Sequence, residues 1–241
     1  MNDSFNFENR DDGLFLSLKT QSHHFKMQFG NTNGSVANFS EKNLDLKFKR
    51  IKQVHGDKVV HTSLHSMDYA SEADAHYSAE SNLALCILTA DCFPIFILQP
   101  EQNNFFAIHA GWRGIANRIV PKSLQKAKSL GFNLEKTLVI CGPHIQKQSF
   151  EIQNDVRDQL LASSKIASNS SNKNLLFQPT SDTHGLFDLN SLLRLQLQEF
   201  QIAENNIYIS EINTVSDLSY HSFRRDRDKS GRQVSWICKT N

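Results

Sequence analysis

The feature of the sequence that most constrains its fold is a set of short, continuous apolar runs. Four of them lie in the middle of the chain: Leu83–Leu88, Ile95–Leu98, Phe105–Ala110 and Leu138–Cys141. Apolar runs of this length, bounded by polar residues, are typical of strands that are buried on both faces. We therefore expect these four segments to form the buried strands of the protein.

Helix signals alternate with these strands. We expect a helix from about Asn117 to Leu130, capped by Asn117 and ended by Gly131, and a second helix over Leu189–Phe200, capped by Asp188. A shorter helix is expected over 154–161, and later strands over 207–209 and 234–238. Mixed helices and strands indicate an α/β or α+β fold. We expect one domain over residues 1–241, with a variable N-terminal segment at 1–25.

Composition and charge exclude several classes of protein. The chain has 26 Lys+Arg against 25 Asp+Glu, so its balance gives no reason to expect nucleic acid or an anionic membrane as a partner. The longest apolar stretch is interrupted by Asp91 and Pro94, and it is shorter than a membrane span. The first residues are polar and acidic rather than signal-like, so we expect a cytoplasmic protein with free or metal-binding cysteines.

Three segments at strand ends concentrate chemically active residues. They are Gln53–Asp57, Thr89–Pro94 and His109–Gly114. Within them, His55, Cys92 and His109 are ligand types that suit zinc, and three protein ligands leave a fourth position for water. The wide spacing is unlike that of a zinc finger. The residues alone therefore leave a second interpretation open, in which Cys92 is a small buried side chain and the histidines are ordinary polar residues.

Neighbouring residues add to the metal hypothesis. Gly111 and Gly114 flank Trp112-Arg113 and allow close approach of the backbone to a ligand. Asp91 interrupts an apolar run, where a charge is costly unless it is paired or functional. We consider three roles for its carboxylate: capping the turn, orienting a histidine, or acting as general acid–base near a metal-bound water.

Two later motifs are candidates for ligand contacts. The Gly-Pro turn that follows Cys141 is expected to expose His144, either as a polar turn residue or as a ligand contact. The charge-rich segment 222–228 is either a solvated turn with local ion pairs or an anion site. In the second case Arg224 and Arg225 are the candidate anion ligands, and Arg113 is a further candidate.

Taken in order, these motifs resemble the YfiH family, which includes YlmD-type proteins and FAMIN and is also called the laccase-domain or multicopper polyphenol oxidase family. The matching stretches are QVHGDKV (53–59), TADCFPI (89–95), HAGWRG (109–114), CGPHI (141–145), SFRRD (222–226) and GRQVSWI (231–237). The resemblance covers nearly the whole chain from about Phe29. HAGWRG with the preceding ADC is highly specific.

This resemblance implies a layered α/β sandwich with mixed sheets and a zinc site formed by His55, Cys92 and His109, with copper as a substitute. It also implies a purine nucleoside phosphorylase that acts on adenosine, inosine, guanosine and S-methyl-5′-thioadenosine, with adenosine deaminase activity. Purine nucleoside and phosphate would be the partners of a monomer or homodimer. We expect Asp91 (as proton carrier), Cys92 and Arg113 to be catalytic. The candidate substrate and phosphate ligands are Asn38, Arg113, His144, Arg224 and Arg225.

The sequence departs from the family pattern in two places. Phe29–Ser35 stands where the family has F-S-T-R-x-G-G and lacks the arginine, and Asn213-Thr214 replaces Cys-Thr. These departures concern an anion contact and a pocket wall, and the metal triad is unaffected.

Three alternative functions remain open. A copper oxidase of phenols is disfavoured, because a multicopper site needs many clustered ligands and the ten histidines include no His-x-His pair. An amidase that edits a peptidoglycan precursor would use Cys92 as a nucleophile with a histidine base. A binding module without catalysis would fit the missing arginine. Metal content and nucleoside turnover distinguish these functions.

Overall fold

The computed structural model describes residues 4–169 and 174–240, whose strands form three sheets. Sheet 1 has the order β1-β2-β3-β15-β7-β4, and sheet 2 has the order β14-β10-β8-β9-β6-β5. The strands of sheet 1 are β1 (Ser4–Arg10), β2 (Gly13–Lys19), β3 (His24–Gly30), β4 (Lys47–Arg50), β7 (Leu83–Thr89) and β15 (Gln233–Thr240). Those of sheet 2 are β5 (Val59–His61), β6 (Ala75–Ser78), β8 (Phe93–Leu98), β9 (Phe105–Ala110), β10 (Leu138–Cys141) and β14 (Ile207–Ile209). Parallel pairs (β4 with β7, β5 with β6, β10 with β14) occur among antiparallel ones, so both sheets are mixed.

Sheets 1 and 2 pack face to face around an apolar core. Phe29 of β3 and Phe96 of β8 stack across the interface, with ring centroids 4.8 Å apart. Successive residues of a strand point to opposite faces, so Phe96 faces sheet 1 whereas Ile95 and Ile97 face the opposite side. This double burial explains why the central strands are continuous apolar runs.

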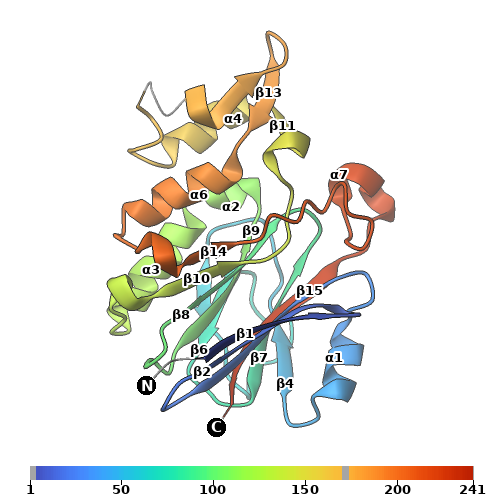
Figure 1. Cartoon of the computed structure of the whole chain (residues 1–241), viewed down its shortest axis with the longest axis vertical. Coiled ribbons are helices and arrows are strands. Elements are labelled where there is room, and N and C mark those ends of the chain that lie inside the picture. The colour runs from blue at the N-terminus through green and yellow to red at the C-terminus, as the bar shows by residue number, and fades with distance from the viewer. Residues whose placement is uncertain (1–3, 170–173, 241) are drawn as a thin grey trace.

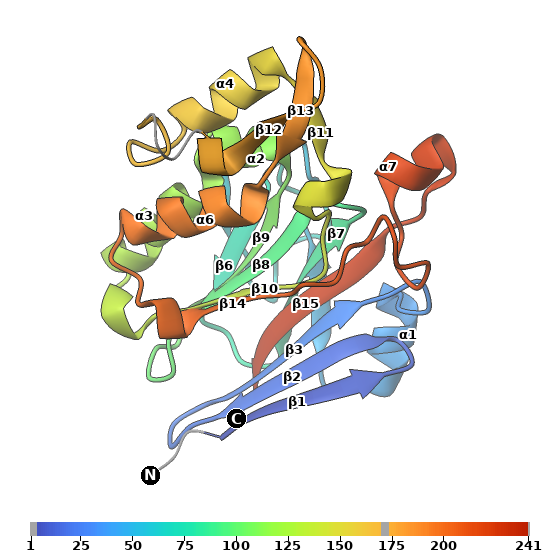
Figure 2. The same ribbon diagram turned by 45° about the horizontal axis from the view of Figure 1, so that its top comes forward.

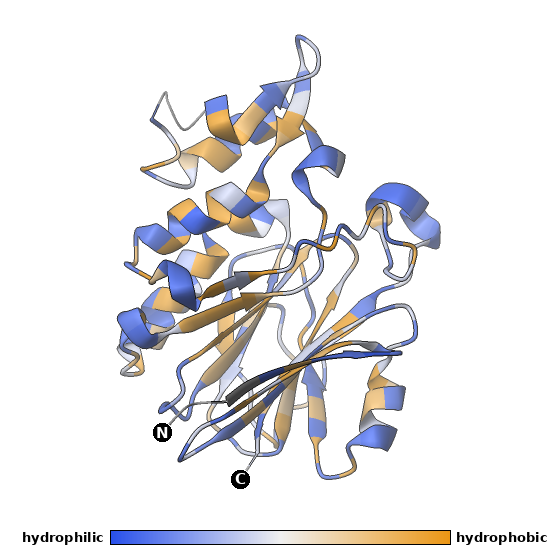
Figure 3. Ribbon diagram, viewed as in Figure 1, coloured by the Kyte–Doolittle hydropathy of each residue, from blue (hydrophilic) through white to orange (hydrophobic). Residues whose placement is uncertain are grey.

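Helices cover the outer faces of both sheets (Figure 1). Sheet 2 is covered by α2 (Trp112–Ala116), α3 (Ile119–Ser129) and α6 (Leu189–Gln198), and sheet 1 by α1 (Val36–Lys42). Phe39 of α1 meets Trp236 of β15 edge to face, with ring centroids 6.2 Å apart. The central strands are mostly hydrophobic in Figure 3, whereas the exposed turns of the helices are hydrophilic. The expected layered α/β sandwich with mixed sheets is confirmed.

A small antiparallel sheet extends beyond α6 (Figure 2). It has the order β11-β13-β12 and packs with α4 (Asn154–Ala162). Its strands are β11 (Glu151–Gln153), β12 (Phe177–Pro179) and β13 (His184–Phe187). Near the C-terminus, α7 (Phe223–Asp226) continues into the 3-10 turn η4 (Arg227–Lys229). The guanidinium of Arg224 on α7 donates to the carbonyl oxygen of Glu151, at 3.0 Å, and so joins α7 to β11.

The expected strands and the helix after Asp188 are confirmed, and Asp188 caps that helix by accepting from the Ser191 N–H at 2.9 Å. The expectation of one helix from Asn117 is wrong. Asn117 is the C-cap of α2, Arg118 adopts a left-handed φ of 64°, and α3 begins at the next residue. A left-handed residue interrupts the helical hydrogen-bond pattern, and Arg118 is held by an ion pair with Glu199 at 2.7 Å.

The helices within residues 4–169 and 174–240 are too short or too polar for any of them to cross a membrane.

Candidate metal centre

Four neighbouring strands bring the predicted ligands together. Cys92 directly precedes β8, and β8 pairs antiparallel with β9 so that Pro94 lies opposite His109. Asp74 directly precedes β6, which pairs with β9, and His55 lies in the loop before β5. Because β5 and β6 are parallel, the His55 loop and Asp74 lie at the same end of sheet 2. The site therefore forms where β9 passes into α2 (Figure 1).

His55, Cys92 and His109 converge on one point. Each offers one ligand atom, and these atoms all lie within 4.8 Å of one another. The two imidazole rings are nearly perpendicular, at 87°, with centroids 4.8 Å apart. His109 is buried, Cys92 is half-buried and His55 is exposed, so the cluster opens to solvent on the His55 side.

The backbone of Gly111 lies closely against the triad. A Cβ atom on Gly111 would lie 3.0 Å from Cδ2 of His55 and 3.1 Å from Sγ of Cys92. Gly111 thus allows the start of α2 to lie against the triad. Two imidazoles and a thiolate form a donor set that fits Zn²⁺, and also copper, with a position left for water or substrate. The residues present fit the implied metal.

Asp74 is a buried carboxylate that the sequence reasoning missed. Its Oδ1 accepts from Nδ1 of His109 at 2.7 Å, which leaves Nε2 of His109 as the nitrogen available to a metal. The sequence contained one signal, a charged residue between Ala73 and Ala75 at the start of a strand. Asp91 was selected because a charge within an apolar run is costly unless it is paired or functional, and the same argument applies to Asp74. The sequence alone does not show that Asp74 is buried.

The triad behaves electrostatically as an ion pair when no metal is bound. Burial alone would raise the pKa of Cys92, but the His109 and His55 rings outweigh it and lower that pKa to about 6. Burial alone would lower the pKa of His109, but Cys92 and Asp74 raise it to about 9. A thiolate at neutral pH is the form that binds a metal or attacks an electrophile.

Asp91 has a left-handed φ of 82° at the crossing from β7 to β8. Its Oδ1 accepts from the Thr214 hydroxyl at 2.7 Å, and its Oδ2 accepts from the backbone N–H of Arg224 at 2.6 Å. The carboxylate therefore holds two later segments of the chain, those that carry Thr214 and Arg224, beside Cys92. These bonds reach residues far along the chain rather than the N–H groups of the turn that contains Asp91, so they differ from the turn cap expected from the sequence, and the proton-carrier role stays a prediction.

The expectation that the Gly-Pro turn exposes His144 is wrong, because this residue is fully buried. Its ring stacks on Phe93 with centroids 3.8 Å apart, and Nδ1 donates to the carbonyl oxygen of Gly142 at 2.7 Å. Nε2 lies 2.6 Å from the side chain of Asn190 and 3.0 Å from that of Gln146. Burial lowers the pKa of His144 to about 4. The ring is thus satisfied within the protein.

The three candidate arginines occupy different environments. Arg113 is exposed on α2, its guanidinium lies 4.5 Å from the centroid of Trp112, and its side chain makes no hydrogen bond to another described residue. Arg224 is half-buried and uses Nη1 to reach β11. Arg225 donates to the Asp226 carboxylate at 2.7 and 2.9 Å and to carbonyl oxygens between residues 214 and 220. The contacts of Arg225 hold the 214–220 loop, while Arg113 and Arg224 retain N–H groups for an anion.

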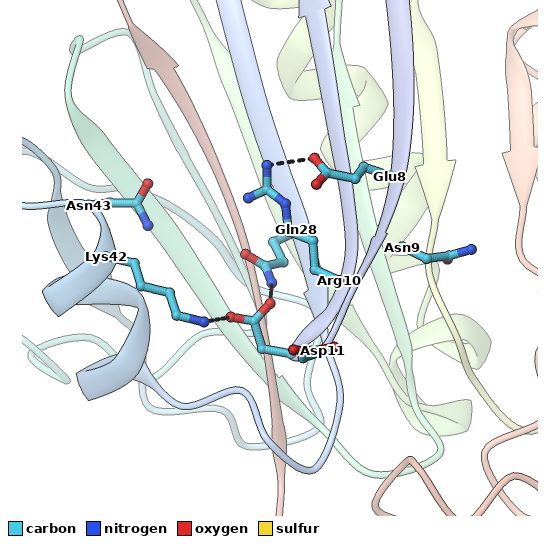
Figure 4. Close-up of a pocket in the computed structure, with 8 residues that line it drawn as sticks. Glu8, Asn9, Arg10, Asp11, Gln28, Lys42 and Asn43 are labelled. Atoms are coloured by element: carbon cyan, nitrogen blue, oxygen red, sulfur yellow. Dashed lines mark hydrogen bonds and ion pairs between the residues drawn. The ribbon is translucent and has the colours of Figure 1, made fainter.

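Asn38 is not brought to the triad by any described hydrogen bond. It lies exposed on α1, accepts from the Ser35 hydroxyl at 2.8 Å and donates to the carbonyl oxygen of Asn33 at 2.9 Å. A polar pocket of about 350 Å³ lies between α1 and the β1–β2 hairpin. Figure 4 shows Lys42 and Gln28 converging there on a carboxylate, which belongs to Asp12. The residues that line this pocket include none of the predicted site residues.

Comparisons with known proteins agree with this architecture. Residues 26–240 match the family model described as multi-copper polyphenol oxidoreductase laccase. The chain is 32% identical over 195 residues to a purine nucleoside phosphorylase of Staphylococcus saprophyticus, covering 77% of this chain and 70% of that protein. It is 26% identical over 240 residues to the purine nucleoside phosphorylase YlmD of Bacillus subtilis, covering 96% and 82%.

The fold is shared with a solved structure over its full length. The crystal structure of YlmD from Geobacillus stearothermophilus superposes with a TM-score of 0.79 at 23% identity and covers 100% of both chains. The resemblance noted from the sequence motifs is therefore confirmed. The chain belongs to the multi-copper polyphenol oxidoreductase laccase family, also called the laccase-domain or YfiH family.

Proposed function

We propose that this protein is a zinc-dependent purine nucleoside phosphorylase. The observation that carries the proposal is the convergence of His55, Cys92 and His109, whose ligand atoms lie within 4.8 Å of one another beside Gly111. Relatives named purine nucleoside phosphorylases align over most of the chain, which supports the reaction class.

In phosphorolysis, a phosphate oxygen bonds to C1′ of the ribose while the bond from C1′ to the purine nitrogen breaks. The purine leaves with the electron pair of that bond and takes up a proton, and ribose 1-phosphate remains. The protein must hold a phosphate dianion and stabilise negative charge on the departing base. His55, Cys92 and His109 would hold the zinc, which would supply a Lewis acid for this charge.

Arginine side chains supply the positive charge for phosphate. Arg113 stands one residue after the start of α2, close to the triad through Gly111, and its N–H groups have no partner among the described residues. Arg224 is tied by its backbone to Asp91, the residue before Cys92. We assign phosphate to Arg113 and Arg224, because a guanidinium binds two oxygens of one anion in a fixed geometry. The contacts of Arg225 indicate that it stabilises the 214–220 loop instead.

Adenosine deamination is a second activity of the proposed site. There, water adds at C6 of the purine and ammonia leaves, so inosine forms without phosphate. Zinc deaminases of nucleobases use a His/Cys metal in this way. Product analysis separates the two reactions, since only phosphorolysis releases free base and only deamination proceeds without phosphate.

The first experiment measures the metal content of the protein and then its products from adenosine and inosine, each with and without phosphate. Stoichiometric zinc with phosphate-dependent release of free base supports the proposal. Zinc-free protein that is inactive on every nucleoside contradicts it. Stoichiometric copper with oxidation of phenols would favour the oxidase instead.

One observation favours a second candidate function for the metal-free protein. Cys92 contacts His109, whose Nδ1 lies 2.7 Å from Asp74, and this is the order of groups in a cysteine hydrolase. An amidase that uses Cys92 as its nucleophile would keep its activity in a strong chelator and lose it on alkylation. A zinc-dependent phosphorylase would lose its activity in the chelator.

A further inference from the structure

The carboxylate of Asp74 contacts both histidines of the triad. Its side chain is fully buried and accepts four hydrogen bonds. Oδ1 accepts from Nδ1 of His109 at 2.7 Å and from the backbone N–H of His55 at 2.9 Å. Oδ2 accepts from the N–H groups of Val54 at 3.1 Å and Gly56 at 2.7 Å. A carboxylate has about four acceptor sites, so this one is saturated.

The loop that carries His55 is shaped around that carboxylate. His55 adopts a left-handed φ of 58°, a conformation that is uncommon for residues other than glycine. Three successive N–H groups, of residues 54 to 56, then point to one side and form a concave anion-binding nest. The anion in this nest is the carboxylate of Asp74, which directly precedes strand β6.

His109 is held by Asp74 at two points. Its ring nitrogen bonds the Asp74 carboxylate, and its backbone N–H donates to the Asp74 carbonyl oxygen at 2.7 Å. The ring can therefore present only Nε2 to the triad. The ring of His55 lies near that of His109 because the His55 backbone bonds the same oxygen, Oδ1.

We propose that Asp74 is a positioning residue that assembles the metal centre before any metal binds, by fixing the His55 loop and the His109 ring with a single carboxylate. This inference rests on the proposed function only in treating His55, Cys92 and His109 as metal ligands. Outer partners of metal-bound histidines fix ring orientation, and their loss typically costs 10–100-fold in metal affinity. Asp74 controls two ligands, so we expect its removal to weaken zinc binding about 100-fold.

The test compares Asp74→Asn with wild type and with Glu199→Gln. Asparagine keeps the size of the side chain, but its NH₂ group cannot accept a hydrogen bond. Glu199 is a matched control, because its half-buried carboxylate also accepts several hydrogen bonds, from Ser164 at 2.6 Å, from the Lys165 N–H at 3.0 Å and from Arg118 at 2.7 Å, and none of its described bonds reaches a triad residue. We expect both variants to lose stability, and only Asp74→Asn to lose zinc affinity in a competition assay with a chromophoric chelator.

A second readout is independent of activity and of zinc affinity. Co²⁺ bound to the wild-type triad gives visible absorption bands that report the ligand geometry, and Asp74→Asn should shift these bands. Asp74→Glu keeps the negative charge but lengthens the side chain by one methylene group. We therefore expect it to recover at most part of the zinc affinity that Asp74→Asn loses. Equal zinc affinity and equal Co²⁺ spectra in wild type and a folded Asp74→Asn would overturn the proposal.

A measurement on the unmodified protein covers the case in which Asp74→Asn does not fold. Hydrogen exchange of the amides of residues 54–56 is followed by NMR in metal-free and zinc-loaded wild type. Preassembly predicts strong protection of these amides without metal and little change on loading. Free exchange without metal would show that the metal orders the loop, which contradicts the proposal. Failure of wild type to bind any metal would instead contradict the proposed function.

Discussion

The backbone N–H of Arg224 donates to Oδ2 of Asp91 at 2.6 Å and so joins two residues that are 133 positions apart. The other carboxylate oxygen of Asp91 binds Thr214, 2.7 Å away. Because Cys92 follows Asp91 directly, this one side chain docks the C-terminal α7 segment beside the metal centre. The segment places the backbone of Arg224 against Asp91, while its guanidinium donates to the Glu151 carbonyl oxygen of β11.

Replacing Asp91 by asparagine should release α7 without removing a metal ligand. Asparagine tolerates the left-handed φ at this position, but its single acceptor oxygen cannot take both the Thr214 hydroxyl and the Arg224 N–H, as the two carboxylate oxygens do. We expect a loss of about 1–3 kcal/mol in the free energy of unfolding, with zinc content unchanged. Chemical denaturation and metal analysis measure both quantities. Thr214→Val removes only one of the two bonds and should lose less stability, and a loss of zinc in Asp91→Asn would make Asp91 a ligand or an orienting group.

Cys92→Ala should separate metal binding from folding. The side chain is a candidate ligand at the open side of the triad and lies outside the apolar clusters of the core, so its loss should abolish zinc binding and turnover with little effect on stability. Cys238→Ala is the matched control, because Cys238 is fully buried on the face of sheet 1 whose core cluster includes Phe39 of α1. That variant should lose about 1–2 kcal/mol of stability and keep its zinc. Full activity in Cys92→Ala would refute the metal site.

The strands and the triad were predictable for different reasons. A strand that is buried on both faces, such as Phe93–Leu98, leaves a continuous apolar run in the sequence, and the short length and polar boundaries of that run identify it. The triad followed from residue types at strand ends together with a family resemblance. The contacts of Asp74 and His144 could not be predicted in this way, because they depend on neighbours that are distant in sequence.

His144 shows the limit of local reasoning most directly. A Gly-Pro turn commonly exposes the next residue, but this ring lies on Phe93 and bonds Asn190, which is 46 positions away. Gly142 is needed for a similar reason, since a Cβ there would lie 2.2 Å from the Phe29 ring. The break between α2 and α3 likewise lies at Arg118, which has a left-handed φ of 64° and forms an ion pair with Glu199, 81 positions away.

The stability of the protein should fall as the pH drops below about 6.5, the ordinary pKa of histidine. His76 is fully buried beside Thr62, and burial lowers its pKa from 6.5 to about 3. Between pH 6.5 and about pH 3, His76 therefore binds a proton in the unfolded chain but not in the folded chain. Lowering the pH in this range favours the unfolded state. We expect the free energy of unfolding to fall by about 1.4 kcal/mol per pH unit from this residue alone.

His76→Gln should reduce that slope by about 1.4 kcal/mol per pH unit between pH 6 and 5. Urea denaturation of wild type and variant in the same chelator-containing buffers measures the difference, and chelation removes the pH dependence of metal binding from the comparison. Equal slopes in the two proteins would show that His76 is protonated in the folded state or hydrated there.

Truncation of Arg113 should affect phosphate binding, whereas truncation of Arg225 should affect stability. The guanidinium of Arg113 faces solvent, whereas that of Arg225 donates its hydrogen bonds to other groups of the protein. Arg113→Ala should raise the KM for phosphate by about 10-fold, equal to about 1.4 kcal/mol of binding, with the KM for nucleoside and the melting temperature nearly unchanged. Arg225→Ala should instead lose about 2–3 kcal/mol of stability, because carbonyl oxygens of the 214–220 loop and the Asp226 carboxylate lose their donor. Initial-rate kinetics at varied phosphate and thermal denaturation measure the two effects. A raised phosphate KM in Arg225→Ala at full stability, with none in Arg113→Ala, would move the anion site from α2 to α7.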